Sequence, residues 1–440
     1  MNVTPLIIVK ARHTAISGGY RRLYEVLKRG KHEGINFIIL TDLVSYQNFI
    51  QMFPDFKNVL EQYKSYFVGP NKIKSISSKS PRILKSLTSY GDFFVSAVSI
   101  SKIVREENAE LIVSPSEGTP SVWTSYLSGE MSRTPWTALF QGETPLFQPT
   151  SGLGCINPLN VLRHVSRKEF TRKVPLLSRV GFSIELLGLL KIAEKSLMLS
   201  VSRSLSEEIS ALNPRVMFHV ITPGNGVDFE KFNAKLSPNV VYDAIFFSRL
   251  IPEKGMFDLL KTWKIVTKKF PRAKLAVAGI IEDFKFVEKF LEMISHYNLG
   301  KNVVYLGPQD QNSIIRLIKA SKLTIYPSIF DAFPLVILES LACGTPVITY
   351  NISTVRHNFI NCKAVLRCPI KDVSSVAKNV ISILENENLR GQLSKEAREF
   401  ASNFDWKKVV NAEKEAYFKV IERFQQTKMK GLNSSHTFLL

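Results

Sequence analysis

Short apolar runs, rich in Val, Ile, Leu and Phe, recur along the chain and alternate with longer segments of helical spacing. In the first half these runs lie at residues 5–9, 36–40, 111–114, 136–140, 197–202 and 217–221. Strands of a parallel sheet are apolar on both faces, because helices cover the sheet on each side. The alternation therefore predicts an α/β fold built on a parallel sheet.

The alternation starts again after a turn-rich stretch at 222–239, with apolar runs at 240–247, 274–278, 303–306, 323–326 and 346–350. A chain of 440 residues has room for two or three domains of about 150 residues each. The sequence thus predicts two doubly wound, Rossmann-like domains. We place them at 1–222 and 223–405, followed by a helix at 406–426 and a flexible tail at 427–440. The buried stripe of that helix is predicted at Val409, Val410, Ala416, Tyr417 and Val420.

The chain is strongly basic, with 58 Lys and Arg against 38 Asp and Glu and a net charge of +20. Such a balance favours an anionic partner, such as a phosphate ligand, a membrane surface or nucleic acid. Residues 1–220 hold 27 basic and 17 acidic side chains, and the rest hold 31 and 21, so neither half is the basic one. Because no nucleic-acid motif occurs either, we expect no nucleic acid as partner.

The segment 326–350 carries the clearest chemical signal. An apolar strand ends near Pro327, a loop carries Asp331, and Pro334 suits the first helical position. Residues 335–342 are expected to be helical until Gly344 ends the run. The N–H groups at such a helix start have no partner inside the helix and favour a phosphate group.

The donors at this helix start are expected to be Leu335 and Val336. Glu339 lies one turn further on the same face, where its carboxylate can accept ribose hydroxyls. Asp331, on the preceding loop, is expected to face whatever follows the diphosphate.

Two cations precede another predicted helix, in the segment 246–255. Arg249 follows the strand and Lys254 comes five residues later. Such a pair would neutralise a diphosphate and stabilise it as a leaving group. In the first half, Gly18 and Gly19 follow the first strand and precede a helix, which would let backbone approach a ligand closely. An ordinary turn is an equal alternative for these two glycines.

These residues resemble the retaining nucleotide-sugar glycosyltransferases of GT-B fold known as family 4 or group 1. The matching motifs are SRLIPEKG at 248–255, LAVAG at 275–279, VVYLG at 303–307 and YPSIFDAFPLVILESLACGTPVI at 326–348. Two stretches around the predicted hinge, VSRSLSEEI at 201–209 and NGVDFEKF at 225–232, resemble the family as well. The rest of the first half resembles the family only in the alternation of strands and helices and in Gly18 and Gly19.

The resemblance implies two domains facing a cleft, with the last helix crossing back to the first domain. It also implies roles for single residues. Arg249 and Lys254 would bind the donor diphosphate, Asp331 the donor sugar and Glu339 the ribose, with Arg249, Lys254 and Asp331 forming the catalytic set. The backbone of Phe333, Pro334, Leu335 and Val336 would complete the phosphate site.

The sequence departs from this family at two places. Asp331 stands where the family usually has Glu, and Phe140 to Glu143 occupy the region where it often places a histidine. We list His13, Glu117, Gln141 and Glu143 as acceptor-side residues, with exposed surface roles as the alternative for His13, Glu117 and Glu143. No Asp-x-Asp pair occurs in the chain, so we expect neither a metal nor another cofactor.

Four cysteines, oddly spaced, indicate neither a disulfide framework nor a zinc site, and we expect a cytoplasmic protein without signal peptide or membrane span. Nine basic residues between 163 and 203 surround an apolar stretch at 174–190, and a further basic run covers 72–85. This pattern favours a peripheral contact with an anionic membrane, although packing of the apolar stretch on the sheet is the commoner outcome.

We therefore expect a metal-independent retaining glycosyltransferase, which uses a nucleotide-sugar donor and a glycan or lipid-linked acceptor. A sugar-nucleotide epimerase or phosphorylase of the same fold is one alternative. A non-catalytic nucleotide-sugar-binding homologue is the other.

Overall fold

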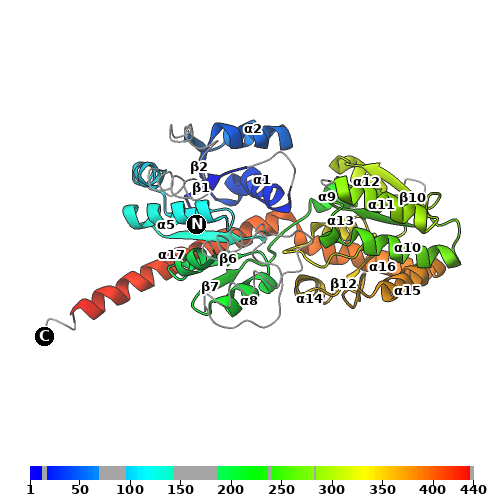
Figure 1. Ribbon diagram of the computed structural model, residues 1–440. Coiled ribbons are helices and arrows are strands. Elements are labelled where there is room, and N and C mark those ends of the chain that lie inside the picture. Colours follow the sequence, from blue (N-terminus) through cyan, green and yellow to red (C-terminus); the bar gives the residue numbers. More distant parts are fainter. Residues whose placement is uncertain (12–16, 69–95, 143–185, 236–239, 282–283, 437–440) are drawn as a thin grey trace. The chain divides into compact units, whose positions relative to one another are not determined.

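The computed structural model describes residues 1–11, 17–68, 96–142, 186–235, 240–281 and 284–436. These residues form two compact units (Figure 1). Unit 1 consists of Met1–Gly224 together with Val409–Leu440, and unit 2 consists of Asn225–Lys408.

Unit 1 is built on a seven-stranded parallel sheet in the order β3-β2-β1-β4-β5-β6-β7. From β1 the chain adds strands first on one side and then on the other, so the order reverses between β1 and β4. The edge strand β3 is absent from our prediction, because its sequence KSYF is partly exposed and lacks an apolar run. The strands are β1 (Pro5–Val9), β2 (Ile38–Thr41), β3 (Lys64–Phe67), β4 (Leu111–Ser114), β5 (Trp136–Phe140), β6 (Leu197–Ser200) and β7 (Met217–Val220).

The helices of unit 1 begin where the sequence supplies a cap. The Ser17 side chain accepts a hydrogen bond from the Tyr20 N–H at the start of α1, and Asp42 does the same for Ser45 at the start of α2. Residues 96–106 and 186–193 are helical as well. The named helices are α1 (Gly18–Gly30), η1 (Lys31–Glu33), α2 (Leu43–Met52), α3 (Phe56–Leu60), α5 (Thr119–Ser132) and α8 (Arg203–Leu212).

Unit 1 is completed by α17 (Trp406–His436), whose residues belong to it from Val409 onward. The five residues of the predicted stripe are all buried, which confirms the amphipathic pattern. The helix does not end at 426 as predicted but continues to His436. The reason is that no proline interrupts 406–436 and the stretch after 424 contains Gln, Lys and Met, which favour helix.

An ion pair lies within this packing. Arg22, on α1, and Glu413, on α17, are exposed by 1% and 3%, and Arg22 Nη2 lies 2.7 Å from Glu413 Oε2. Arg22 Nε also donates a hydrogen bond of 2.7 Å to the carbonyl oxygen of Gly224, the last residue of unit 1 before the chain enters unit 2. The Tyr417 hydroxyl donates to Glu413 Oε1.

Unit 2 contains a six-stranded parallel sheet in the order β10-β9-β8-β11-β12-β13. The order reverses between β8 and β11, which are neighbours. We predicted the first strand from 240, but it starts at Ala244, and β13 was not predicted. The strands are β8 (Ala244–Phe247), β9 (Leu275–Ala278), β10 (Val303–Gly307), β11 (Thr324–Tyr326), β12 (Val347–Tyr350) and β13 (Val365–Cys368).

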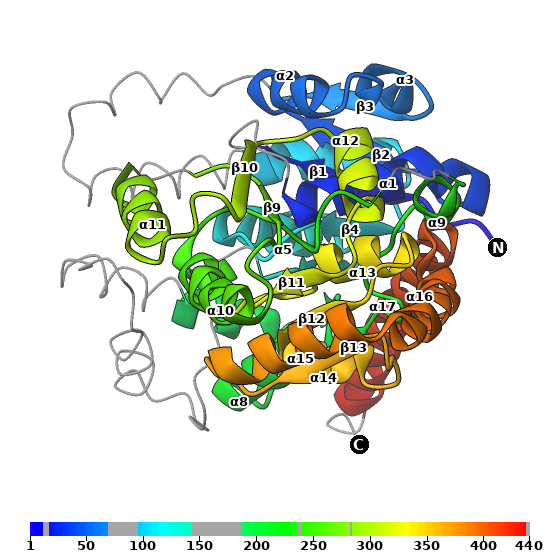
Figure 2. The same ribbon diagram turned by 90° about the vertical axis from the view of Figure 1, so that its right-hand side faces the viewer.

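Helices cover both faces of this sheet, as Figure 2 shows. On one face α10 (Met256–Lys269) packs between α11 (Phe284–His296) and α15 (Val373–Glu385), and on the other lie α12 (Gln311–Lys319) and α13 (Leu335–Ala342). The remaining elements are α9 (Phe229–Asn233), η4 (Pro252–Lys254), α14 (Ser353–Phe359), α16 (Glu387–Ala401) and η5 (Ser402–Phe404). Within the described ranges, no helix is both long enough and apolar enough to span a membrane.

Candidate functional site

The residues that the sequence singles out in unit 2 lie at the point where its strand order reverses. Arg249 and Lys254 follow β8, Asp331 follows β11, and these two strands are adjacent in the sheet. The chain leaves β8 toward α10 on one face and leaves β11 toward α13 on the other. Loops diverge at such a point and leave a crevice beyond the carboxyl ends of the strands, where ligands of doubly wound sheets bind.

Two glycines allow the backbone to pack closely here. Gly255 has φ +79°, and a Cβ atom at this position would lie 2.0 Å from the carbonyl oxygen of Pro327. Gly279, after β9, has φ +147°, and its Cβ would lie 1.8 Å from the carbonyl oxygen of Ser248. Any other residue would force these segments apart. The glycine positions thus fix the loops after β8, β9 and β11 against one another.

Hydrogen bonds hold the loop after β11 to the segment that precedes Lys254. The Ile329 N–H donates to the Glu253 carbonyl oxygen at 3.0 Å. The Ser328 hydroxyl lies within hydrogen-bond distance of the same oxygen at 3.1 Å and of the Phe330 oxygen at 2.7 Å. Lys254 and Asp331, 77 residues apart in the sequence, are therefore held next to each other.

Lys254 and Asp331 form a largely buried ion pair. Lys254 Nζ lies 2.6 Å from Asp331 Oδ2, and the two side chains are exposed by 13% and 16%. Tyr326, the last residue of β11, donates its hydroxyl to Asp331 Oδ2 at 2.6 Å and accepts a bond of 2.9 Å from Lys254 Nζ. Burial alone would lower the pKa of Lys254, but the neighbouring Asp331 carboxylate raises it above its usual range, so the ammonium stays charged.

The start of α13 has the geometry of an anion site. Pro334 is the N-cap and not the first helical residue as predicted. Leu335 and Val336 are the first helical residues, whose N–H groups have no partner inside a helix. Leu335, Val336 and Glu339 are half-buried on one face, while the residues between and beyond them are buried. The Phe333 N–H, which we had counted toward the phosphate site, donates instead to Asp331 Oδ1 at 3.1 Å.

Arg249 differs from Lys254 in its surroundings. It lies in the turn after β8, closed by a hydrogen bond of 3.0 Å from the Ile251 N–H to the Arg249 carbonyl oxygen, and it is exposed. The predicted cation pair therefore consists of one exposed residue and one enclosed residue. Within the described part of the chain, no three His, Cys, Asp or Glu side chains are grouped so that they could hold a metal ion.

The candidate residues of unit 1 lie at the corresponding edge of the other sheet. Gly18 and Gly19 are the first two residues of α1, after the Ser17 cap, so they form the helix start rather than precede it as predicted. Glu117 and Gln141 follow β4 and β5. Glu117 is fully buried, and one of its oxygens accepts a bond of 2.9 Å from the Gln141 N–H.

The burial of Glu117 contradicts the alternative of an exposed loop carboxylate. The Gln141 side chain also donates to the Pro115 carbonyl oxygen at 2.5 Å, so both residues tie the loop after β4 to the end of β5. His13 and Glu143 lie outside the described residues.

Tyr326 is absent from the residues predicted for this site, because a tyrosine at the end of an apolar strand is expected to be a core residue.

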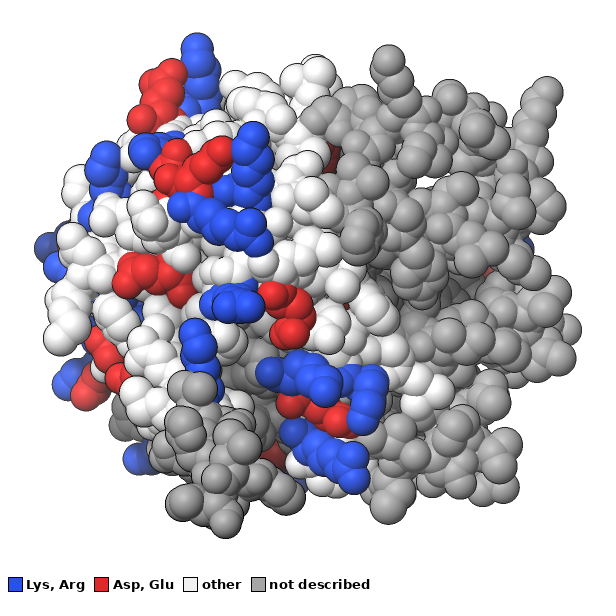
Figure 3. All heavy atoms as spheres, turned by 90° about the vertical axis from the view of Figure 1, so that its left-hand side faces the viewer, with Lys and Arg blue, Asp and Glu red and all other residues white. Residues whose placement is uncertain are grey.

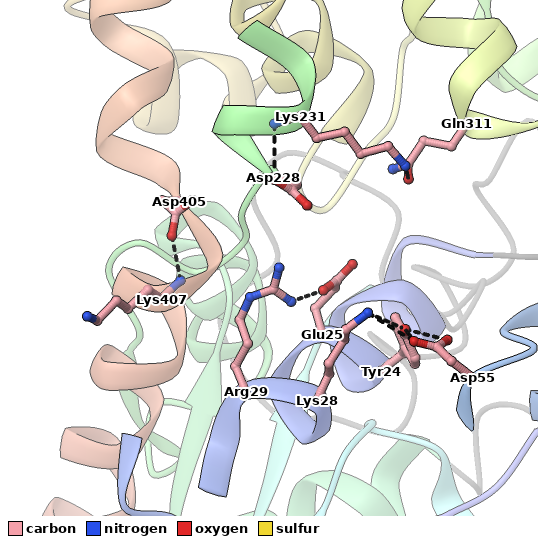
Figure 4. A network of polar contacts seen from close by, with 10 residues as sticks. All are labelled: Tyr24, Glu25, Lys28, Arg29, Asp55, Asp228, Lys231, Gln311, Asp405 and Lys407. Carbon is pink, nitrogen blue, oxygen red and sulfur yellow. Dashed lines mark hydrogen bonds and ion pairs between the residues drawn. The ribbon is translucent and has the colours of Figure 1, made fainter. Parts of the chain in front are cut away.

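A second Lys–Tyr–Asp arrangement occurs in unit 1 (Figure 4). There the Tyr24 hydroxyl donates to Asp55 at 2.6 Å, and Lys28 Nζ lies 3.0 Å from both the Tyr24 hydroxyl and Asp55 Oδ2. That arrangement is more open, since Lys28 and Asp55 are 44% and 46% exposed.

Comparison with known proteins relates this geometry to a family. Residues 228–400 match the family described as glycosyl transferases group 1. A glycogen synthase of Mycobacterium tuberculosis is 24% identical over 229 residues, which cover 51% of this chain and 55% of that protein. The chain thus spans about half the length of the curated relatives it matches.

Solved structures resemble the chain over nearly its whole length. A glycosyltransferase from Rickettsia africae has a TM-score of 0.67 and 19% identity, covering 96% of this chain and 99% of that one. The Anabaena protein HepE in complex with UDP-glucose has a TM-score of 0.63 and 16% identity, covering 98% of this chain and 100% of that one. At these identities the likeness shows the fold, and it confirms the predicted GT-B class with two doubly wound units.

Proposed function

We propose, from the match of residues 228–400 to the family of group 1 glycosyl transferases, that the protein transfers a sugar from a nucleotide-diphosphate donor to an acceptor. The single observation that carries the proposal is the meeting of Lys254, Asp331 and the start of α13 where the strand order of unit 2 reverses. A diphosphate needs cations and free N–H donors at one place, and this edge of the sheet supplies both.

Each group has a separate task in the proposed reaction. The Leu335 and Val336 N–H groups bind the diphosphate together with Arg249 and Lys254. Asp331 accepts from the donor sugar, and Glu339 accepts from the ribose. The bond between the sugar C1 and the donor phosphate oxygen breaks, while the acceptor hydroxyl oxygen bonds to C1 from the same face. The leaving phosphate oxygen takes the hydroxyl proton. The anomeric configuration is retained, and the protein's cations neutralise the leaving group in place of a metal.

The acceptor is proposed to be a glycan, first of all a lipid-linked one, bound by unit 1. This part of the proposal draws on the basic and apolar run 163–203, of which Lys191, Lys195 and Arg203 lie among the described basic residues. Lys191 is paired with Glu194 at 3.0 Å and Arg203 with Glu207 at 2.8 Å. On the face drawn in Figure 3, the described Lys and Arg side chains likewise lie among Asp and Glu side chains. Lys195 is the remaining described basic residue of this run, and it is exposed.

The test is thermal unfolding with UDP, GDP and ADP in the presence of EDTA, on the parent protein and on Arg249→Ala. A ligand at 100 times its dissociation constant adds about 2.7 kcal/mol of stability. We expect one of the three nucleotides to raise the melting temperature of the parent protein more than the others do. In Arg249→Ala most of this increase should be lost. Arg272→Ala serves as the matched control. Arg272 is an exposed arginine of the same unit, but it lies just before β9, at the amino ends of the strands and away from the proposed site.

The sugar nucleotide of the selected base is then offered with lipid-linked and water-soluble glycan acceptors. Transfer in EDTA with retention would support the whole proposal. A selective nucleotide shift with no transfer to either acceptor would favour the non-catalytic binding homologue. If no nucleotide raised the melting temperature of the parent protein, the proposed diphosphate site would be contradicted.

A further inference from the structure

All three N–H donors of Lys254 are occupied within unit 2. Lys254 Nζ lies 2.6 Å from Asp331 Oδ2, 2.9 Å from the Tyr326 hydroxyl and 3.3 Å from the Phe330 carbonyl oxygen. A lysine ammonium has three donors and no acceptor. Lys254 can therefore contact a diphosphate oxygen only by giving up one of these partners.

Asp331 is nearly saturated as well. Its Oδ2 accepts from both Lys254 and Tyr326, and its Oδ1 accepts from the Phe333 N–H at 3.1 Å. A carboxylate offers about four lone-pair positions, so a single one is left for a sugar hydroxyl. The residue that the family resemblance assigns to the donor sugar is thus bound to the lysine that it assigns to the diphosphate.

The negative charges of Asp331 and of a diphosphate would both attract the Lys254 ammonium group. The ion pair is largely shielded from water, so the attraction between Lys254 and Asp331 is stronger than between exposed groups. A diphosphate that approaches Lys254 offers the same kind of anionic acceptor as Asp331. The carboxylate and the diphosphate therefore compete for one ammonium group.

We propose that Asp331 and Tyr326 hold Lys254 in competition with the donor diphosphate, Tyr326 as a positioning residue and Asp331 as a residue that then contacts the donor sugar. Binding of the diphosphate takes over a donor of Lys254 and frees lone pairs on Asp331 for a sugar hydroxyl, so that the two parts of the donor are recognised together. This inference rests on the proposed function for the identity of the donor.

The first test measures the affinity of the full-length protein for inorganic pyrophosphate and for UDP by titration calorimetry. In Asp331→Asn the amide oxygen can still accept from the Lys254 ammonium, but the acceptor no longer carries a negative charge, so the ion pair is lost and the bond is weaker. We expect pyrophosphate to bind about tenfold more tightly, and turnover with a sugar nucleotide to show a lower KM together with a lower kcat. A role of Asp331 in sugar contact alone predicts unchanged affinity for pyrophosphate and UDP.

Tyr326→Phe removes one acceptor of Lys254 without changing charge, so a smaller gain in pyrophosphate affinity is expected. Tyr24→Phe is the matched control, because Tyr24 makes the same contacts with Lys28 and Asp55 in unit 1. It should leave pyrophosphate affinity unchanged. Equal effects of the two substitutions would overturn the role of Tyr326.

Two further variants separate competition from a general change in charge. Glu253→Gln removes a negative charge from the residue next to Lys254, and it should not reproduce the tenfold gain in affinity for pyrophosphate. In a Lys254→Met background, Asp331→Asn should give no gain, because the group that is competed for is absent. A gain that persists without Lys254, or that Glu253→Gln reproduces, would overturn the inference.

The outcomes for the inference and for the proposed function are distinct. Tighter pyrophosphate binding in Asp331→Asn without sugar transfer by the parent protein would support the competition and contradict transferase activity. Sugar transfer by the parent protein with unchanged pyrophosphate affinity in Asp331→Asn would support the activity and contradict the competition.

Discussion

Arg22 is a charged side chain buried in unit 1, held by Glu413 and by the Gly224 carbonyl oxygen. Removing one partner of a buried ion pair leaves an uncompensated charge, which costs about 3–5 kcal/mol. We therefore expect Arg22→Met to lower the free energy of unfolding of unit 1 by about that amount. Urea denaturation followed by circular dichroism would measure the change.

The matched control for Arg22 is an arginine in an exposed pair. Arg203 lies 2.8 Å from Glu207 on α8, and these side chains are 71% and 50% exposed. Exposed pairs contribute about 1 kcal/mol or less, so Arg203→Met should change stability little. If both substitutions had the same small effect, the buried pair would not contribute as inferred.

At the scale of elements, the strongest prediction from sequence was the helix α13, while the anion site expected at its start stays a prediction. Its helical run, Pro334 and the buried strand before it are all local features that sequence spacing expresses. Edge strand β3 was not predicted, because its sequence lacks an apolar run. The contact between Lys254, Tyr326 and Asp331 was not predicted either, because it joins two segments that are far apart in the chain. Periodicity cannot reveal which polar groups meet across a strand reversal. For the same reason the burial of Glu117 was not foreseen.

The junction between η4 and α10 gives a prediction for an element. Gly255 has φ +79° and lies against the Pro327 carbonyl oxygen, so Gly255→Ala should strain the backbone and displace Lys254. We expect a loss of more than about 1 kcal/mol in the stability of unit 2, together with a smaller thermal shift by nucleotide. Gly391→Ala on α16 is the control, because a Cβ there meets nothing within 4 Å. It should stabilise the helix by about 0.5–1 kcal/mol. Equal stability of the two variants would contradict this reading of Gly255.

At the scale of the whole molecule, the two units differ in how the chain builds them. Unit 2 is one continuous segment, Asn225–Lys408, whereas unit 1 requires Val409–Leu440 in addition to Met1–Gly224. The sequence predicted two doubly wound domains because the strand rhythm restarts after the turn-rich stretch at 222–239. The burial of Val409, Val410 and Tyr417 explains why the last helix belongs to the unit that the chain began with.

This difference predicts how the chain can be divided. The two ends of unit 2 are joined to each other, since the Val227 N–H donates to the Phe404 carbonyl oxygen at 2.8 Å and Val227 forms a bridge with Asp405. A fragment of residues 225–408 should therefore fold by itself and unfold cooperatively. It should also keep the thermal shift by nucleotide, because Arg249, Lys254, Asp331 and α13 all lie within it.

Residues 1–224 are expected to behave differently as a fragment. Without α17 they lose Glu413, so Arg22 would be left as a buried charge without its partner. The apolar surface that Val409, Val410 and Tyr417 cover would also be exposed, which favours aggregation. Adding a peptide of residues 406–436 should restore solubility and cooperative unfolding, and the same peptide with Glu413→Ala should do so poorly. A soluble, cooperatively folding 1–224 fragment would show that α17 is not needed to complete unit 1.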